Sequence, residues 1–458
     1  MGLSVDTIIK ATGGRLLQGE GREIKAVSID TRTICEAEIF FALRGPVFDG
    51  HGFVEIAAQK GAVGAVVEAA EGFNVSAGFS VIVVQDTLKA LGDLAGHIRR
   101  SYPVRVVAIS GTCGKTTTKD MTARILSERG VLKTEGNKNN LVGLPLTLAG
   151  LSDSHTAAVL ELGISRPGEM KRLSDICAPD VALITNIGRG HLEGMGDIEG
   201  VAGEKGELFG ALGPDGTAIV NLDDPRVRGM ARKNAGNRKW IAYSMTETAD
   251  VRVKDFAMDG FIVKDVILDI RGRELEIRLD AAGEFNLMNA AGAAAAGLSF
   301  DVSDDEIKRG LEGFTPQKGR MCAHRLAGVV LLDDTYNANP CSFDAALKTL
   351  SRAGGRKIAV IGGMFELGKH TEAALFEAGK RAGLLGVDVI VSVGDMSSVL
   401  AAGALTVGLK SAYPFEDKSS AAEFLKTIIK EGDTILVKGS RAAGMETIIE
   451  GLKNVLVN

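Results

Sequence analysis

Residues 110–118 read Ser-Gly-Thr-Cys-Gly-Lys-Thr-Thr-Thr, a glycine-rich loop between a strand pattern and a helix pattern. Residues 104–109 are mostly β-branched or apolar, and residues 119–126 carry apolar side chains at helical spacing. In such a strand–loop–helix unit, backbone N–H groups and the helix dipole bind phosphate, a lysine contacts the outer phosphates and a threonine contacts Mg²⁺. The stretch therefore predicts an ATP site formed by Gly111, Thr112, Cys113, Gly114, Lys115, Thr116 and Thr117.

The loop is shorter than the usual phosphate-binding pattern, because Gly111 lies only three positions before Gly114. A tight strand-to-helix turn without a ligand is the alternative, but Gly-Lys-Thr in this context is typical of a phosphate site. We interpret Cys113 as a small residue that the loop tolerates, not as a nucleophile.

Composition and charge are typical of a globular α/β protein. A chain of 458 residues is long enough for about three domains. The formal net charge of −5 argues against a nucleic-acid-binding surface, which is normally basic. The cysteines are odd in number and form no Cys-x-x-Cys pair, which favours a reducing compartment. Because no apolar run could cross a bilayer and the first residues lack a basic signal region, we expect a cytoplasmic protein without membrane insertion.

The pattern of elements changes along the chain and predicts an α/β fold with three domains. Residues 1–102 carry short strands and helices, and residues 103–317 form a central domain with a mainly parallel sheet around the phosphate loop. Alternating residues at 250–280 predict appended antiparallel hairpins, followed by an alanine-rich helix. Residues 318–458 alternate strands with helices, which predicts a Rossmann-like, doubly wound C-terminal domain.

Polar residues follow several predicted strands, at the sheet edge where open α/β proteins bind ligands. Glu161 ends one strand pattern and is suited to Mg²⁺, which takes one or two carboxylates plus phosphate oxygens in nucleotide sites. A helix cap or a surface ion pair is the alternative for Glu161. His191 follows the next strand, where a metal ligand and a structural histidine are equally compatible with the pattern.

Lys205 lies on the apolar stripe of a helix that is predicted to begin near Asp197. A charged amine on a buried face is costly unless it is paired or chemically changed. The alternative is a lysine that extends to solvent at the edge of the stripe.

Two further candidates belong to the C-terminal domain. Asp334 ends a strand pattern and leads into an Asn-rich turn, where it could be a catalytic group or the cap of an Asx turn. Arg320 could clamp phosphate or be an ordinary surface residue.

Taken together, these motifs resemble the Mur ligase family, ATP-dependent enzymes that form amide bonds in peptidoglycan precursor synthesis. The resemblance covers essentially the whole chain, because the motifs occur in the family's order: Asp30-Thr31-Arg32, Asp49-Gly50-His51, the phosphate loop, Gly136-Asn137-Lys138-Asn139-Asn140, Glu161-Leu162-Gly163, His191-Leu192-Glu193-Gly194, Glu204-Lys205-Gly206-Glu207, Asn286-Leu287-Met288-Asn289 and Asp334-Thr335-Tyr336-Asn337-Ala338-Asn339-Pro340.

The resemblance implies a role for each matched residue. Lys115 and Thr116 would hold ATP phosphates and Mg²⁺, and Glu161 and His191 would serve the metal ions. Lys205 matches the family lysine that CO₂ carbamylates, so that a carbamate acts near a second metal. Arg320 and Asp334 would reach the nucleotide from the third domain, and Asn289 would contact the adenine side of ATP. The residues that would bind the UDP-linked substrate are Asp30, Thr31, Arg32, Asp49, Gly50, His51, Asn137 and Asn140. The implied catalytic set is Lys115, Lys205, His191 and Asp334.

Within the family, the Glu-Leu-Gly, Gly-Asn-x-Asn-Asn and Tyr-Asn-Ala-Asn-Pro motifs imply an enzyme that joins D-alanyl-D-alanine to a UDP-linked muramoyl tripeptide through an acyl phosphate. The third peptide residue stays open between lysine and a diaminopimelate. Arg166 and Gly363 depart from the His and Asp that are common in relatives, and Gly363 bears on the contact to the dipeptide. The alternatives are a ligase similar to folylpolyglutamate synthetase and a nucleotide-switched binding protein. We expect a monomer that binds no nucleic acid.

Overall fold

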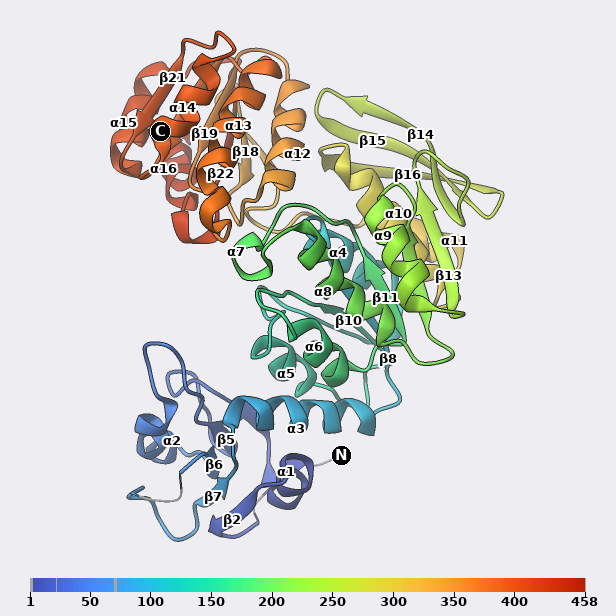
Figure 1. Ribbon diagram of the computed structural model, residues 1–458, viewed down its shortest axis with the longest axis vertical. Helices are drawn as coiled ribbons and strands as arrows, with labels where there is room; N and C mark the ends of the chain where they lie inside the picture. Colours follow the sequence, from blue (N-terminus) through green and yellow to red (C-terminus); the bar gives the residue numbers. More distant parts are fainter. Residues whose placement is uncertain (1–2, 22, 70–71, 458) are drawn as a thin grey trace.

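The computed structural model describes residues 3–21, 23–69 and 72–457, and it arranges three main sheets one after another along the molecule (Figure 1). A short pair, β1 (Leu3–Ser4) with β3 (Glu23–Ile24), accompanies the first of them. The fold class predicted from the sequence is confirmed, since the elements are mixed α/β with a largely parallel central sheet and antiparallel additions.

The N-terminal sheet has five strands over the described residues, and β4, β5, β6 and β7 run parallel in it. Its strand order is β2 (Arg15–Gln18), β7 (Ser80–Val83), β6 (Gly64–Val67), β5 (Glu38–Phe41) and β4 (Ala26–Ser28). The helices of this unit are α1 (Val5–Thr12), α2 (Val54–Gln59) and α3 (Thr87–Ser101). Helix α3 packs against α1 on one side and against α5 and α6 of the central unit on the other, so it joins the two units (Figure 1).

The central sheet carries the phosphate loop at the end of its strand β8. The strand order is β16 (Arg273–Ala282), β15 (Ile262–Ile270), β14 (Val251–Asp259), β13 (Lys239–Ser244), β12 (Thr217–Asn221), β11 (Val181–Ile184), β8 (Arg105–Ser110), β10 (Ala157–Glu161) and β9 (Val131–Lys133). Strands β9 to β14 and β8 pair in parallel, whereas β15 pairs antiparallel with both neighbours. The predicted hairpins are therefore present, and they stand beside the C-terminal unit in Figure 1.

Strand β8 is buried on both faces, as its β-branched composition predicts. Val106 and Ala108 face one apolar core, while Val107 and Ile109 face another, because successive side chains of a strand point to opposite faces. The helices of this unit are α4 (Lys115–Ile125), α5 (Gly143–Leu148), α6 (Glu169–Cys177), α7 (Leu192–Met195), α8 (Ile198–Gly210), α9 (Pro225–Met230), α10 (Phe285–Leu298) and α11 (Asp304–Glu312). Helices α10 and α11 pack on α4, which fixes the helix that follows the phosphate loop.

The C-terminal unit is a doubly wound sheet whose carboxyl edge faces the central unit. Its strand order is β17 (Cys322–Leu326), β18 (Val329–Asp334), β22 (Thr434–Lys438), β19 (Lys357–Ile361), β20 (Val389–Val393) and β21 (Ala412–Phe415). All pairs are parallel except β17 with β18. Its helices are α12 (Pro340–Ser351), α13 (Thr371–Leu384), α14 (Ser397–Leu405), α15 (Lys418–Ile428) and α16 (Glu446–Val457). In the described part of the chain, no helix has both the length and the apolar character that a bilayer crossing requires.

Candidate functional site

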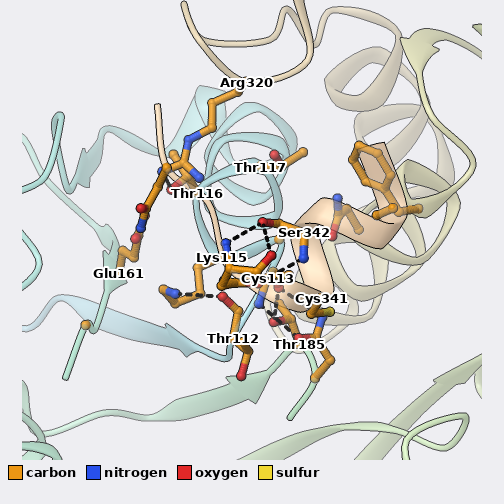
Figure 2. Close-up of a pocket in the computed structure, with 18 of the residues that line it drawn as sticks. Thr112, Cys113, Lys115, Thr116, Thr117, Glu161, Thr185, Arg320, Cys341 and Ser342 are labelled. Carbon is orange, nitrogen blue, oxygen red and sulfur yellow. Dashed lines mark hydrogen bonds between the residues drawn. The ribbon is translucent and has the colours of Figure 1, made fainter. Parts of the chain in front are cut away.

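A cavity of about 790 Å³ lies between the central and C-terminal units, a volume within the usual range for small-molecule sites. It is lined by the phosphate loop and by residues at the carboxyl ends of four strands, namely Glu161 at the end of β10, Thr185 after β11, Asp334 at the end of β18 and Lys438 at the end of β22. Figure 2 shows the loop residues Lys115 and Thr116 with Glu161 on one side and the first turn of α12 on the other. The sheet edges that the sequence singled out thus meet at one site.

Two glycines give the phosphate loop its shape. Gly111 and Gly114 have φ values of 141° and 83°, which side chains rarely adopt. A Cβ at Gly111 would lie 1.9 Å from Thr185 Oγ1, and one at Gly114 would lie 2.3 Å from Asn289 Oδ1. The loop can therefore approach both neighbours only because these positions lack side chains.

The phosphate loop is hydrogen-bonded to the residues that follow strand β11. The Cys113 N–H donates to Asn186 Oδ1 at 2.9 Å, and the Asn186 amide donates back to the Cys113 carbonyl at 3.0 Å. Thr185 Oγ1 donates to the same carbonyl at 2.6 Å, and the Thr112 N–H donates to the Asn186 carbonyl at 3.0 Å. These bonds order the loop before any ligand arrives, which reduces the entropy cost of binding.

Lys115 and Thr116 open helix α4 and face the cavity. Lys115 Nζ donates to the carbonyls of Gly111 at 2.9 Å and Thr112 at 3.3 Å, and burial lowers the pKa of this amine. Thr116 Oγ1 accepts a hydrogen bond from Arg320 at 2.9 Å. The Arg320 guanidinium also stacks over the Tyr336 ring, 4.0 Å from its centroid, so the C-terminal unit reaches the phosphate loop.

Glu161 is 2% exposed, which rules out the surface ion pair that the sequence left open. Its Oε1 accepts from Asn139 Nδ2 at 2.8 Å, whereas Oε2 is buried without a hydrogen-bond partner among the described residues. A buried carboxylate oxygen without a partner is costly unless a cation compensates it. The residue therefore fits a Mg²⁺ ion held together with phosphate oxygens and the Thr116 hydroxyl. Within the described ranges, no three His, Cys, Asp or Glu side chains form a ready-made metal cluster.

Lys205 is fully buried on helix α8, so the alternative of a lysine that extends to solvent is wrong. Its Nζ has no hydrogen-bond partner in the described part of the chain. Burial lowers its pKa well below the ordinary value, and the charge of Lys115 adds to the effect. The lowered pKa favours the uncharged form of the amine, which is the form that reacts with electrophiles.

His191 contacts a residue that sequence reasoning missed. Its Nδ1 lies 2.8 Å from the Glu366 carboxylate, and this contact lowers the pKa of Glu366. Both residues have positive φ, 56° for His191 and 64° for Glu366, and such strained backbone clusters at functional sites. The Glu193 N–H also donates to the Glu366 carbonyl at 3.2 Å. Only the position of Glu366 shortly after a strand could have suggested it.

Asp334 forms an ion pair with the buried Lys438. Its Oδ2 accepts from Lys438 Nζ at 2.6 Å, and its Oδ1 accepts from the Met321 N–H at 3.1 Å. Lys438 is 1% exposed and also donates to the Asn337 carbonyl at 2.9 Å. The pair orients the strand-end carboxylate toward the cavity.

Three Asn candidates line the same cavity but are engaged in different ways. Asn140 Oδ1 accepts the N–H groups of Val142 and Gly143, while Asn137 lies on the loop before it. Asn289 is buried beside the phosphate loop and accepts from Thr118 Oγ1 at 3.3 Å.

The remaining candidates lie in the N-terminal unit and do not line this cavity. Asp30 and Arg32 form an ion pair that lowers the pKa of Asp30 to about 2, and Asp49 contacts His51 Nδ1 at 2.6 Å. The Asp30–Arg32 pair follows strand β4, and the Asp49–His51 pair follows strand β5, which runs parallel to β4. Glu68 follows the next parallel strand, β6, and its N–H donates to His51 Nε2 at 2.9 Å. They therefore form a second polar edge, at the carboxyl ends of the N-terminal sheet. A Cβ at Gly50 would lie 2.7 Å from the Leu43 backbone, so this turn needs glycine.

Family models match the chain along most of its length. The matches are the Mur ligase middle domain over residues 109–297, the glutamate ligase domain over 319–441, and the Mur ligase catalytic domain over 23–99.

Relatives and solved structures cover nearly the whole chain. The UDP-N-acetylmuramoyl-tripeptide–D-alanyl-D-alanine ligase of Escherichia coli is 36% identical, over 95% of this chain and 95% of the relative. The ligase of the same name from Bacillus subtilis is 34% identical, over 95% of this chain and 94% of the relative. MurF from Acinetobacter baumannii superposes with a TM-score of 0.92 at 33% identity, covering 99% of each chain. MurF ligase from Thermotoga maritima, solved in complex with ADP, has a TM-score of 0.83 at 28% identity and covers 94% of this chain and 98% of its own. The chain therefore belongs to the Mur ligase family.

Proposed function

We propose that this chain joins the amine of D-alanyl-D-alanine to the terminal carboxylate of a UDP-N-acetylmuramoyl-tripeptide, with ATP converted to ADP and phosphate. The observation that carries the proposal is the cavity in which an ordered phosphate loop faces the carboxyl edge of a second doubly wound sheet. Relatives over 30% identical along almost the full chain bear the name of this ligase.

The chemistry requires phosphoryl transfer from ATP to a carboxylate. The carboxylate oxygen attacks the γ-phosphorus and ADP leaves, which gives an acyl phosphate. The amine then attacks the acyl carbon, the phosphate leaves with the former carboxylate oxygen, and the amine loses a proton. Lys115 and Arg320 lie where they can neutralise the crowded anions, which is the main contribution of a protein to phosphoryl transfer.

Magnesium would be held by Glu161 and Thr116, with His191 at the same cavity serving a metal ion. The unpartnered Glu161 Oε2 supports this assignment. Such an ion supplies positive charge to the phosphate oxygens.

Lys205 would carry a carbamate, formed when its neutral amine attacks CO₂ and loses a proton. The fully buried, unpartnered Nζ and its lowered pKa support this modification, because a protonated amine cannot attack CO₂. The resulting carbamate is an anion that can bind a metal ion or pair with a lysine that neutralises phosphate. Lys115 is near enough to Lys205 to influence it electrostatically.

The N-terminal polar edge around Asp30, Arg32, Asp49 and His51 would bind the uridine diphosphate end of the substrate, and residues 1–102 would act as its domain. Residues 103–317 would bind ATP, with Asn289 on the adenine side. Residues 318–458 would dock the dipeptide and close the site with Arg320 and Asp334, which excludes water from the acyl phosphate. We further propose that the enzyme acts as a monomer in the cytoplasm.

The proposal is tested by product analysis with purified full-length protein. ATP, the UDP-linked tripeptide and D-alanyl-D-alanine are supplied together and with each one omitted, and the mass of the uridine-linked product and the release of ADP are measured. We expect the pentapeptide only in the complete mixture. ATP hydrolysis without amide formation would instead favour a nucleotide-switched binding protein, and glutamate addition to a folate would favour the folylpolyglutamate alternative.

A further inference from the structure

Two cysteines from different units meet at the phosphate loop. Cys113 lies in the loop and Cys341 lies in the first turn of α12, and Figure 2 shows the two side chains next to each other. Both side chains are partly exposed and line the cavity. Nothing in the proposed ligation uses either sulfur.

Independent contacts place α12 against the loop at this point. The Cys113 thiol donates to Asn339 Oδ1 at 3.2 Å, and Asn339 is the N-cap of α12. A Cβ at Gly188 would lie 3.5 Å from the Cys341 sulfur, and the Gly188 N–H donates to Thr112 Oγ1 at 2.9 Å. Gly188 thus lies next to Cys341 and is hydrogen-bonded to Thr112, the residue that precedes Cys113 in the loop.

The electronic setting makes Cys113 the reactive member of the pair. The neighbouring Cys341 thiol, together with the charges of Lys115 and Lys438, lowers the pKa of Cys113 to about 7 against the opposing effect of burial. The same interaction with Cys113 raises the pKa of Cys341, so Cys341 is the member of the pair that keeps its proton. Thiolates, not thiols, react with oxidants.

The other cysteines have no such arrangement in the described part of the chain. Burial raises the pKa of Cys177 to about 12, and burial also raises the pKa of Cys322. Cys35 is exposed, and its thiol donates to the Thr33 carbonyl at 3.5 Å. It therefore offers a matched control for general oxidation.

We propose that Cys113 and Cys341 form a reversible disulfide under peroxide, which fastens the C-terminal unit to the phosphate loop and stops ATP turnover. The Cys113 thiolate attacks one oxygen of hydrogen peroxide, so that the O–O bond breaks and hydroxide leaves as water after protonation. The Cys341 sulfur then displaces the second oxygen from the resulting sulfenic acid, which leaves as water with the Cys341 proton. Two thiols and one peroxide give one disulfide and two waters, and a dithiol reverses the reaction.

The consequence for activity follows from the position of the bond. A disulfide across the cavity removes the freedom of α12 to move away from the loop, which nucleotide entry and product release need. Intracellular disulfides are usually transient and redox-sensing, which fits a reversible switch.

The test uses the full-length protein treated with hydrogen peroxide and then digested without reduction. We expect one linked pair of peptides containing Cys113 and Cys341, a loss of ATP turnover equal to the fraction that is linked, and full recovery with dithiothreitol. Cys341→Ala should form no link, and its turnover before peroxide serves as the reference for its turnover after peroxide; Cys35→Ser should behave as the parent does. Binding of a fluorescent ADP analogue is measured in parallel, so the result does not depend on the identity of the ligation substrates.

Three results would overturn the proposal. The first is peroxide-treated parent protein in which Cys113 is sulfenic or sulfinic acid without a link to Cys341. The second is linked protein that binds and turns over nucleotide at the parent rate. The third is a Cys341→Ala protein that loses activity to peroxide with the same dithiothreitol reversal as the parent.

Discussion

Replacing Lys205 by methionine should raise the stability of the protein and remove its ligase activity. The Lys205 amine is fully buried and has no hydrogen-bond partner among the described residues. An unsatisfied buried polar group costs about 1–3 kcal/mol. Methionine fills a similar volume without the amine, so Lys205→Met should stabilise the protein by about that amount in CO₂-free buffer. For a domain of the central unit's size, the melting temperature should rise by roughly 2–4 °C per kcal/mol.

The gain should depend on pH in a defined direction. Burial lowers the pKa of Lys205 below its ordinary value of 10.5. Between the two pKa values the unfolded chain binds more protons than the folded one, so the lysine destabilises the fold more as the pH falls from 10.5. The stability advantage of Lys205→Met should therefore shrink as the pH rises toward 10.

The same variant should lose ligase activity, because the carbamate cannot form. Lys205→Ala should also be folded and nearly inactive, and added formate should restore part of its turnover by filling the vacated space. Lys171, whose side chain is 73% exposed on α6, provides the control, and Lys171→Met should change neither property. Thermal unfolding and ligation rate are measured on all three variants. A destabilised Lys205→Met protein would refute the account of the buried amine, and an active one would refute the carbamate.

Three other changes test the phosphate loop and its neighbours. Lys115→Ala should lower the ligation rate by a factor of about 10² or more, the usual cost of removing a group that stabilises developing charge, with little change in the circular dichroism spectrum. Gly114→Ala should abolish measurable ATP binding in calorimetry, since its Cβ would lie 2.3 Å from Asn289 Oδ1, whereas unchanged affinity would contradict the loop geometry. Asp334→Asn should lower turnover more than affinity for the UDP-linked substrate, because it weakens the 2.6 Å contact with Lys438 far from the uridine end, and equal effects on both constants would count against that role.

The sequence predicted the elements whose signals are local. The phosphate loop, β8, the hairpins of β14 to β16 and helix α10 follow from periodicity, turn residues and alanine content, and the family assignment is confirmed. Strand β21 was missed because it contains Pro414, which only an edge strand tolerates, and β21 lies at the edge of its sheet. Strand β9 was missed because its three residues show no periodicity.

The residues of the candidate site also fall into those that a local sequence pattern marks and those that it does not. Glu161, Lys205 and Asp334 end strands or break a helical stripe, so a sequence pattern marks them, and the burial of Glu161 and Lys205 agrees with that pattern. Glu366 and Cys341 reach the site only through the docking of the C-terminal unit on the central one, and no local pattern encodes that contact. Long-range contacts of this kind depend on how whole domains pack.

Transfer of oxygen from substrate to phosphate tests the central claim, an acyl phosphate formed from ATP, most directly. The tripeptide carboxylate is labelled with ¹⁸O, the full-length protein is incubated with it, ATP and D-alanyl-D-alanine, and the released phosphate is analysed by mass spectrometry. Because the amine expels phosphate with the former carboxylate oxygen, we expect one ¹⁸O atom in the phosphate for each amide formed. Amide formation that leaves the phosphate unlabelled would contradict the mechanism.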